Sequence, residues 1–193
     1  MAHVMDATGT AGPHGDHRIR APELFTGGRA SVSSDIYSSA VTLYALVAGH
    51  LPFDGFTLLA DLEAAVLAGD CLPIRDVAPH VSPALADRIN KGMSIDPAGR
   101  FTSATEFDNA LSLPSRSRRF TPTPPHSGHE RCWLIDGRGG SLNLCVSNGT
   151  SVGLKAFETR HAASGNRVKK HCGIAKVKNL PTQLRKAFNS LRH

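Results

Sequence analysis

Residues 31–53, SVSSDIYSSAVTLYALVAGHLPF, determine the fold class of the N-terminal part of this sequence. Residues 33–35 (Ser-Ser-Asp) are of the types preferred at the N-terminus of a helix, and an apolar run follows them. The run stops at Gly49, and Pro52 lies just beyond it. Because this helix is apolar on nearly all sides, we expect it to be mostly buried within a helical domain.

Three further helices are predicted after this one. Apolar residues recur at helical spacing over residues 57–68 and stop at Gly69. Ser82 is followed by a proline that suits a first helical turn, and residues 103–106 (Ser-Ala-Thr-Glu) have the form of a capping box. We therefore predict a helical domain over residues 1–113, beginning with a surface loop.

The composition changes beyond this domain. Residues 114–128, PSRSRRFTPTPPHSG, offer almost nothing to bury, so we expect a flexible linker. In residues 129–193, two apolar stretches flank a glycine-rich turn at 136–140, which predicts a β-hairpin. A third strand over 152–156 and a C-terminal amphipathic helix starting near Leu180 follow. The fold class predicted for the whole chain is mainly α, with a small basic α+β domain at the end.

Charge is divided unevenly between the two parts. Residues 1–114 hold 7 Lys and Arg against 13 Asp and Glu, whereas residues 115–193 hold 15 against 3. Such a basic excess favours an anionic partner, either nucleic acid or an acidic protein. A solvated surface and docking onto the acidic N-terminal domain are the alternatives. The candidate contacts are Arg160, Arg167, Lys169, Lys170, Lys176, Lys178, Arg185 and Lys186.

Two blocks of the N-terminal domain carry a family resemblance. The first joins residues 21–24 (APEL), 34–38 (SDIYS) and 49–53 (GHLPF), and the second is residues 96–111 (DPAGRFTSATEFDNAL). In order and spacing, both resemble the helical C-terminal lobe of bacterial serine/threonine protein kinases of the eukaryotic-like type. The resemblance covers about residues 5 to 112.

The resemblance implies roles for five residues. In the segment Ala21-Pro22-Glu23, the glutamate matches a family residue that pairs with a distant arginine, here Arg100. Asp35 matches an aspartate that holds the catalytic loop, but that loop has no counterpart here. We therefore expect Asp35 to act only as a favourable carboxylate at a helix N-terminus.

The residues that perform phosphoryl transfer in the family precede the Ala-Pro-Glu segment. Only 20 residues precede Ala21, too few for the nucleotide-binding lobe and catalytic loop. We expect no catalytic residue, and neither ATP nor Mg²⁺ as cofactor, although the intact family uses both. The chain is then a truncated kinase domain, non-catalytic alone; the alternative is a pseudokinase-type scaffold or binding module acting through its basic domain.

Several histidines and cysteines near the C-terminus are of types that bind zinc. Their spacing fits no compact zinc pattern, so the sequence predicts no metal site, and the cysteines are expected to be reduced. The sequence shows neither a signal peptide nor a membrane-spanning stretch, which predicts a cytoplasmic protein. The residues considered as ligands are His126, His129, Cys132, Cys145, His161, His171 and Cys172.

Overall fold

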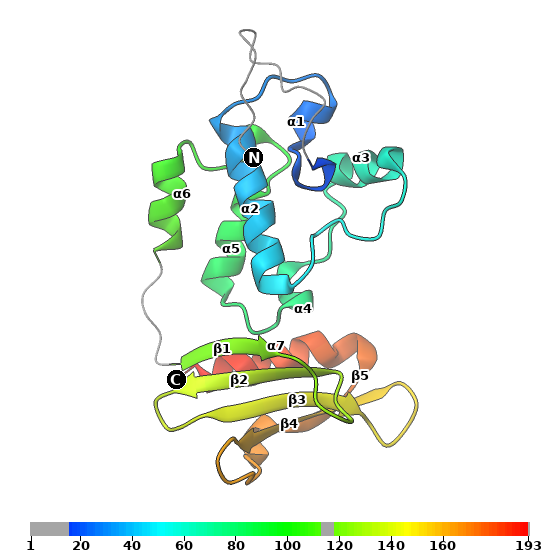
Figure 1. Ribbon diagram of the computed structural model, residues 1–193, viewed down its shortest axis with the longest axis vertical. Helices are drawn as coiled ribbons and strands as arrows, with labels where there is room; N and C mark the ends of the chain where they lie inside the picture. The colour runs from blue at the N-terminus through cyan, green and yellow to red at the C-terminus, as the bar shows by residue number, and fades with distance from the viewer. Residues whose placement is uncertain (1–15, 113–117, 193) are drawn as a thin grey trace. The chain divides into compact units, whose positions relative to one another are not determined.

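The computed structural model (Figure 1) describes residues 16–112 and 118–192, and the chain divides into two compact units, Met1–Leu113 and Pro114–His193. Most of the surface loop predicted at the start of this unit lies outside the described residues, and a short 3-10 turn, His17–Ile19, follows. The described part of the N-terminal unit contains only helices: η1 (His17–Ile19), α1 (Pro22–Phe25), α2 (Val32–Ala48), α3 (Leu59–Ala68), α4 (Ile74–Val77), α5 (Pro83–Gly92), η2 (Pro97–Gly99) and α6 (Ala104–Leu111).

The four predicted helices are confirmed as α2, α3, α5 and α6, and local capping explains where they begin. Helix α2 starts earlier than predicted, because Ser31 and Ser34 form a reciprocal capping box. The Ser82 hydroxyl caps α5, and the Ser103 hydroxyl caps α6. The Glu106 carboxylate does not complete the expected box on Ser103 and instead accepts hydrogen bonds from the backbone and hydroxyl of Thr102.

Helix α2 is the centre of the N-terminal unit, as its apolar sequence predicts. Tyr37 and Val41 pack against α3, whereas Tyr44 packs against α4 and α5. Ile36 and Ala40 contact a third cluster that includes residues of α6. One helix thus contributes to all three apolar clusters of this unit, which is why it is buried on several sides.

The C-terminal unit consists of a five-stranded antiparallel sheet and one long helix. The strands follow each other in space in the order of the chain, and α7 covers one face of the sheet (Figure 1). The elements are β1 (Arg118–Thr123), β2 (Arg131–Gly137), β3 (Leu142–Asn148), β4 (Leu154–His161), η3 (Lys169–His171), β5 (Gly173–Lys176), η4 (Val177–Asn179) and α7 (Leu180–Leu191).

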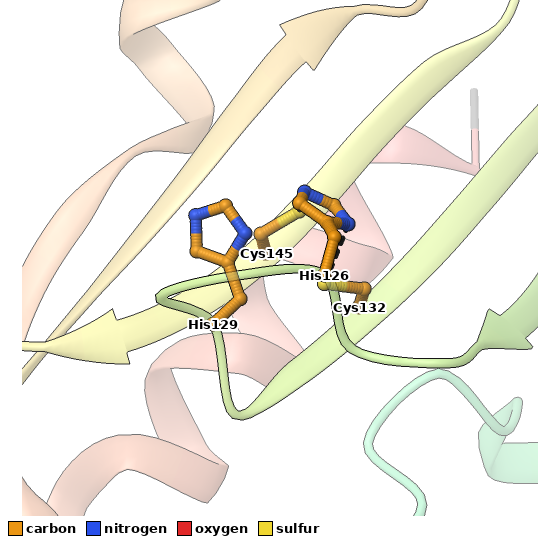
Figure 2. Close-up of side chains that lie close together, drawn as sticks. All are labelled: His126, His129, Cys132 and Cys145. Carbon is orange, nitrogen blue, oxygen red and sulfur yellow. Dashed lines mark hydrogen bonds between the residues drawn. The ribbon is translucent and has the colours of Figure 1, made fainter.

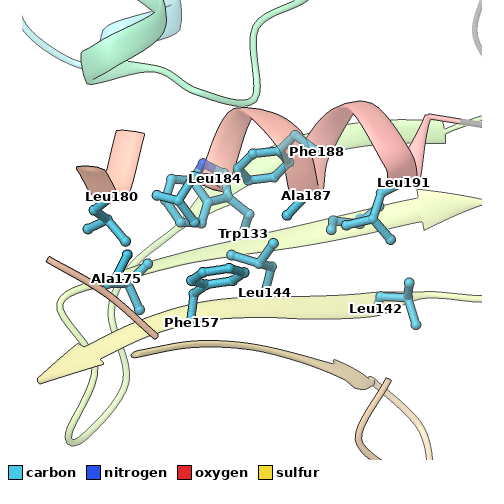
Figure 3. Close-up of a cluster of buried hydrophobic side chains, with 12 residues drawn as sticks. Trp133, Leu142, Leu144, Phe157, Ala175, Leu180, Leu184, Ala187, Phe188 and Leu191 are labelled. Atoms are coloured by element: carbon cyan, nitrogen blue, oxygen red, sulfur yellow. The ribbon is translucent and has the colours of Figure 1, made fainter. Parts of the chain in front are cut away.

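The core of this unit lies between α7 and the sheet (Figure 3). Successive residues of a strand point to opposite faces. Trp133 and Leu144 therefore point toward α7, where Phe188 contacts the tryptophan ring. Cys132 and Cys145 have the opposite parity and lie on the other face, yet both are buried. The second face of the sheet is thus covered locally by something other than α7.

The expected fold class is wrong, because the sheet has five strands and the chain is not mainly α. Part of the predicted linker over residues 114–128 forms β1, whose register pairs Arg118 with Gly137 and Thr123 with Cys132. Phe120, which packs edge-on against Phe188, anchors this otherwise polar strand. A proline and two arginines are compatible with a strand at the edge of a sheet, so this composition does not exclude β structure.

None of the helices in the described residues is both long enough and apolar enough to span a bilayer.

Candidate functional site

In the N-terminal unit, the structure brings Glu23 and Arg100 together although 77 positions separate them. Both guanidinium Nη atoms donate to the carboxylate at 2.8 Å, one to each oxygen. The Arg100 side chain is 0% exposed and that of Glu23 is 18% exposed. This is a bidentate, largely desolvated ion pair, the geometry in which a carboxylate and a guanidinium bind each other most strongly.

The remaining donors of Arg100 bind backbone carbonyl groups. Nε donates to Ser94 at 2.7 Å, Nη1 to Ser33 at 3.0 Å and Nη2 to Ile95 at 3.1 Å. With the two bonds to Glu23, these use every N–H of the guanidinium. Arg100 therefore joins three segments: the start of α1, the start of α2 and the loop before η2.

The pKa of Glu23 reflects the competition between burial and pairing. Burial raises it, but the hydrogen bonds from Arg100, with smaller contributions from the backbone and Ser34, bring the pKa of Glu23 below its ordinary value. The carboxylate is thus charged at neutral pH.

The other kinase-motif residues occupy structural positions. Ala21 is the buried residue before α1, and Pro22 is its first residue. Asp35 lies in the first turn of α2, is exposed, and makes no side-chain hydrogen bond within the described ranges. Its position fits a carboxylate near a helix N-terminus.

The predicted anion contacts are spread over several elements of the C-terminal unit. Arg160 and Arg167 both form ion pairs with Glu158, at 2.9 and 3.3 Å. The Arg185 guanidinium donates to Thr182. The five lysines of the set are exposed, and they lie in η3, at the end of β5, in η4 and in α7.

One of these lysines, Lys170, lines a pocket of about 170 Å³ within this unit. Arg118, His161 and His171 line the same pocket. His171 is buried, and its Nδ1 atom has no hydrogen-bond partner in the described parts of the chain. Burial lowers the pKa of His171, and the positive charges of Lys170 and Arg118 lower it further. The pocket is therefore lined by two cationic side chains, Arg118 and Lys170, and by a buried histidine.

A second cluster combines four of the seven histidines and cysteines considered above (Figure 2). One potential ligand atom from each of His126, His129, Cys132 and Cys145 lies within 4.8 Å of all the others. The histidines are on the loop between β1 and β2, whereas the cysteines are opposite each other on β2 and β3. Burial raises the pKa of the Cys145 thiol to about 12, and the adjacent Cys132 contributes to the increase.

His161, His171 and Cys172 lie elsewhere: the two histidines at the basic pocket, and the Cys172 thiol against the Thr159 and Val168 carbonyl groups. The sequence interpretation missed the four-residue cluster. The sequence offered two signals. His126, His129 and Cys132 follow each other at intervals of three residues, and each strand of the predicted hairpin contains a cysteine.

Among the known proteins that are similar to part of the chain are bacterial protein kinases and one protein whose name does not mention a kinase. Serine/threonine-protein kinase Pkn1 of Myxococcus xanthus is 34% identical over 99 residues, which are 51% of this chain and 14% of that protein. Serine/threonine-protein kinase PknD of Mycobacterium tuberculosis is 35% identical over 100 residues, 52% of this chain and 15% of the kinase. Protein lin-2 of Caenorhabditis elegans is 33% identical over 86 residues, 45% of this chain and 9% of that protein.

The chain thus spans between 9% and 15% of the length of these three relatives. No family model matches it. A solved structure of the Rad53 kinase domain matches 51% of this chain and 39% of its own, with 26% identity and a TM-score of 0.42. Over about half of its length, the chain is related to bacterial serine/threonine protein kinases.

Proposed function

We propose that the N-terminal unit is a kinase-type helical module that does not catalyse phosphoryl transfer in this chain. The observation that carries the proposal is Asp35, which matches the family residue that holds the catalytic loop but makes no side-chain hydrogen bond in the described residues. Glu23 and Arg100 form the buried ion pair that the kinase resemblance implies, which supports the kinase-type helical module. Phosphoryl transfer also needs a phosphate-covering loop, a strand lysine, a catalytic aspartate and metal ligands. No described residue matches one of these in the family pattern.

The test is the binding of Mg-ATP to the 193-residue chain, measured by calorimetry with an active kinase as the positive control. We expect no saturable heat of Mg-ATP binding. Saturable binding together with phosphate transfer to a generic substrate protein would contradict the proposal.

We further propose a cytoplasmic location.

A second function, binding of an anionic ligand, is favoured by the basic pocket of the C-terminal unit. Arg118 and Lys170 supply positive charge there, and the free Nδ1 of His171 lacks a hydrogen-bond partner in the described residues. A phosphate group fits this chemistry, because its oxygens accept several charge-assisted hydrogen bonds. We propose that the pocket binds a phosphate-bearing partner, such as nucleic acid.

This function is tested by titrating a fluorescently labelled oligonucleotide at several salt concentrations. Substituting Lys170→Ala should weaken binding more than Lys186→Ala, which removes an equal charge from the exposed face of α7. Equal losses would indicate non-specific attraction to the net positive charge rather than binding at the pocket.

A further inference from the structure

We propose that His126, His129, Cys132 and Cys145 bind one zinc ion in a closed structural site (Figure 2). Thiolate and imidazole are the ligands that zinc prefers in proteins, and four of them complete its tetrahedral coordination. Oxygen-preferring cations such as Mg²⁺ and Ca²⁺ are disfavoured by this set. Because two thiolates balance the charge of Zn²⁺, the complete site is neutral, which suits its partly buried position.

The distances are close to those of a formed site. With bonds of about 2.0 Å to nitrogen and 2.3 Å to sulfur, tetrahedral ligands lie roughly 3.3 to 3.8 Å apart. The Sγ of Cys132 lies 3.5 Å from Nδ1 of His126, and the Sγ of Cys145 lies 3.6 Å from Nε2 of the same ring. Only one of these nitrogens can bind the ion, so the His126 ring must turn slightly when zinc enters.

The second histidine also has a free ligand atom. The Nδ1 atom of His129 is buried and has no hydrogen-bond partner in the described residues. Its ring lies edge-on to that of His126, with centroids 4.4 Å apart. A buried imidazole nitrogen without a partner is costly, and a metal bond would satisfy it.

The covering loop is attached at its end by Glu130, whose backbone N–H donates to the Val146 carbonyl and whose carboxylate pairs with Lys155. Residues 124–130 read PPHSGHE, and none of them belongs to the apolar core of this unit. A backbone hydrogen bond from His129 to His126 closes a turn, with Gly128 in the left-handed region at φ 82°. This turn places both imidazoles over two cysteines on the sheet face that α7 does not cover. A shared ion would fix the loop to both strands.

A disulfide between Cys132 and Cys145 is the competing chemistry, since the two residues are directly opposite each other on β2 and β3. Both thiols are free in the structure. A disulfide would leave the two histidines without a role, whereas zinc uses all four side chains.

The test uses the full chain purified under reducing conditions with zinc, followed by removal of unbound metal and elemental analysis. We expect about one zinc per chain, and, after exchange with Co²⁺, the visible absorption bands of tetrahedral cobalt with thiolate ligands. Cys145→Ser should remove most of the bound metal. Cys172→Ser is the matched control and should retain it, because Cys172 lies outside the cluster.

Because Cys145→Ser could fail to fold, His126→Ala provides an independent variant at an exposed position. It should lower zinc affinity by at least tenfold while Trp133 fluorescence remains that of the folded unit. Absence of zinc from the reduced chain would overturn the proposal. So would retention of full stoichiometry in both ligand variants, or an intact mass showing a Cys132–Cys145 disulfide that resists mild reductant.

Discussion

The two units of this chain are stabilised in different ways. In the N-terminal unit, one buried guanidinium joins three segments, and its ion-pair partner is 77 positions away. In the C-terminal unit, each strand pairs with its neighbour in sequence, and the apolar core is distributed over many residues. We therefore expect the stability of the N-terminal unit to depend strongly on one polar residue, and that of the C-terminal unit on the packing of its apolar core and on strand register.

The chain carries a convenient probe of this difference. Its only tryptophan, Trp133, is buried in the C-terminal unit, so tryptophan fluorescence reports on that unit alone. Amide hydrogen exchange of α2 reports on the N-terminal unit.

The largest effect is expected from Phe188→Ala. The Phe188 ring is fully buried and contacts Trp133 and Phe120, with centroids 5.1 and 5.6 Å away. The cavity should reduce the free energy of unfolding by about 3 to 5 kcal/mol, measured by urea titration of Trp133 fluorescence. Protection of α2 should not change. A parallel loss of α2 protection would show that the two units unfold together.

Arg100→Met should be nearly as severe, but in the other unit. It leaves the largely buried Glu23 carboxylate unpaired, at a cost of about 3 kcal/mol. Hydrogen exchange of α2 under graded urea measures this loss. The matched control is Lys91→Met, because Lys91 and Glu106 form an ion pair whose side chains are 41% and 40% exposed. The control should cost clearly less than Arg100→Met, because exposed ion pairs add little to stability, and equal costs would contradict the special role of Arg100.

A smaller effect is expected from Gly92→Ala, at the contact of α5 with α2. Replacing glycine by alanine ordinarily stabilises a helix, yet a Cβ here would lie 2.6 Å from the Cβ of Ala40. The clash should destabilise the N-terminal unit by about 1 to 3 kcal/mol in the same exchange measurement. Asn90→Ala, on the exposed side of α5, should be neutral or slightly stabilising. Stabilisation by Gly92→Ala would show that the two helices separate readily.

The smallest effect concerns pH. Since the pKa of Glu23 is lower in the folded state, its contribution to stability is present above its ordinary value of 4.5 and is lost as pH falls through the folded pKa. Glu23→Gln removes this contribution. The stability difference between the parent chain and Glu23→Gln should therefore narrow below pH 4.5. The low pKa of Glu106, about 2, affects both proteins equally. A difference that stays constant with pH would contradict the role of the ionised pair.

Local signals account for what could be predicted in the N-terminal unit. The hydroxyl groups of Ser82 and Ser103 and the glycine at position 49 mark helix ends through interactions within a few residues. The contact of Glu23 with Arg100 has no local signal. It was expected only because both residues stand in motifs that resemble those of kinases.

The C-terminal unit was harder to predict, because strands depend on partners distant in sequence. Strand β1 has one large apolar residue, Phe120. This residue packs against Phe188, which is close in space but lies near the C-terminal end of the sequence. The histidine and cysteine cluster was missed for a related reason. Both strands of the β2 and β3 hairpin were predicted, but only their register places Cys132 opposite Cys145.

The composition of β1 has a consequence for how the protein behaves in concentrated solution. The outer strands of an open sheet offer unpaired backbone groups to which a neighbouring molecule can add a strand. Here one outer strand, β1, contains Pro122, which cannot donate, and two arginines. The other, β5, is only four residues long. Intermolecular strand addition, and the aggregation it starts, is thus disfavoured at both edges of this sheet.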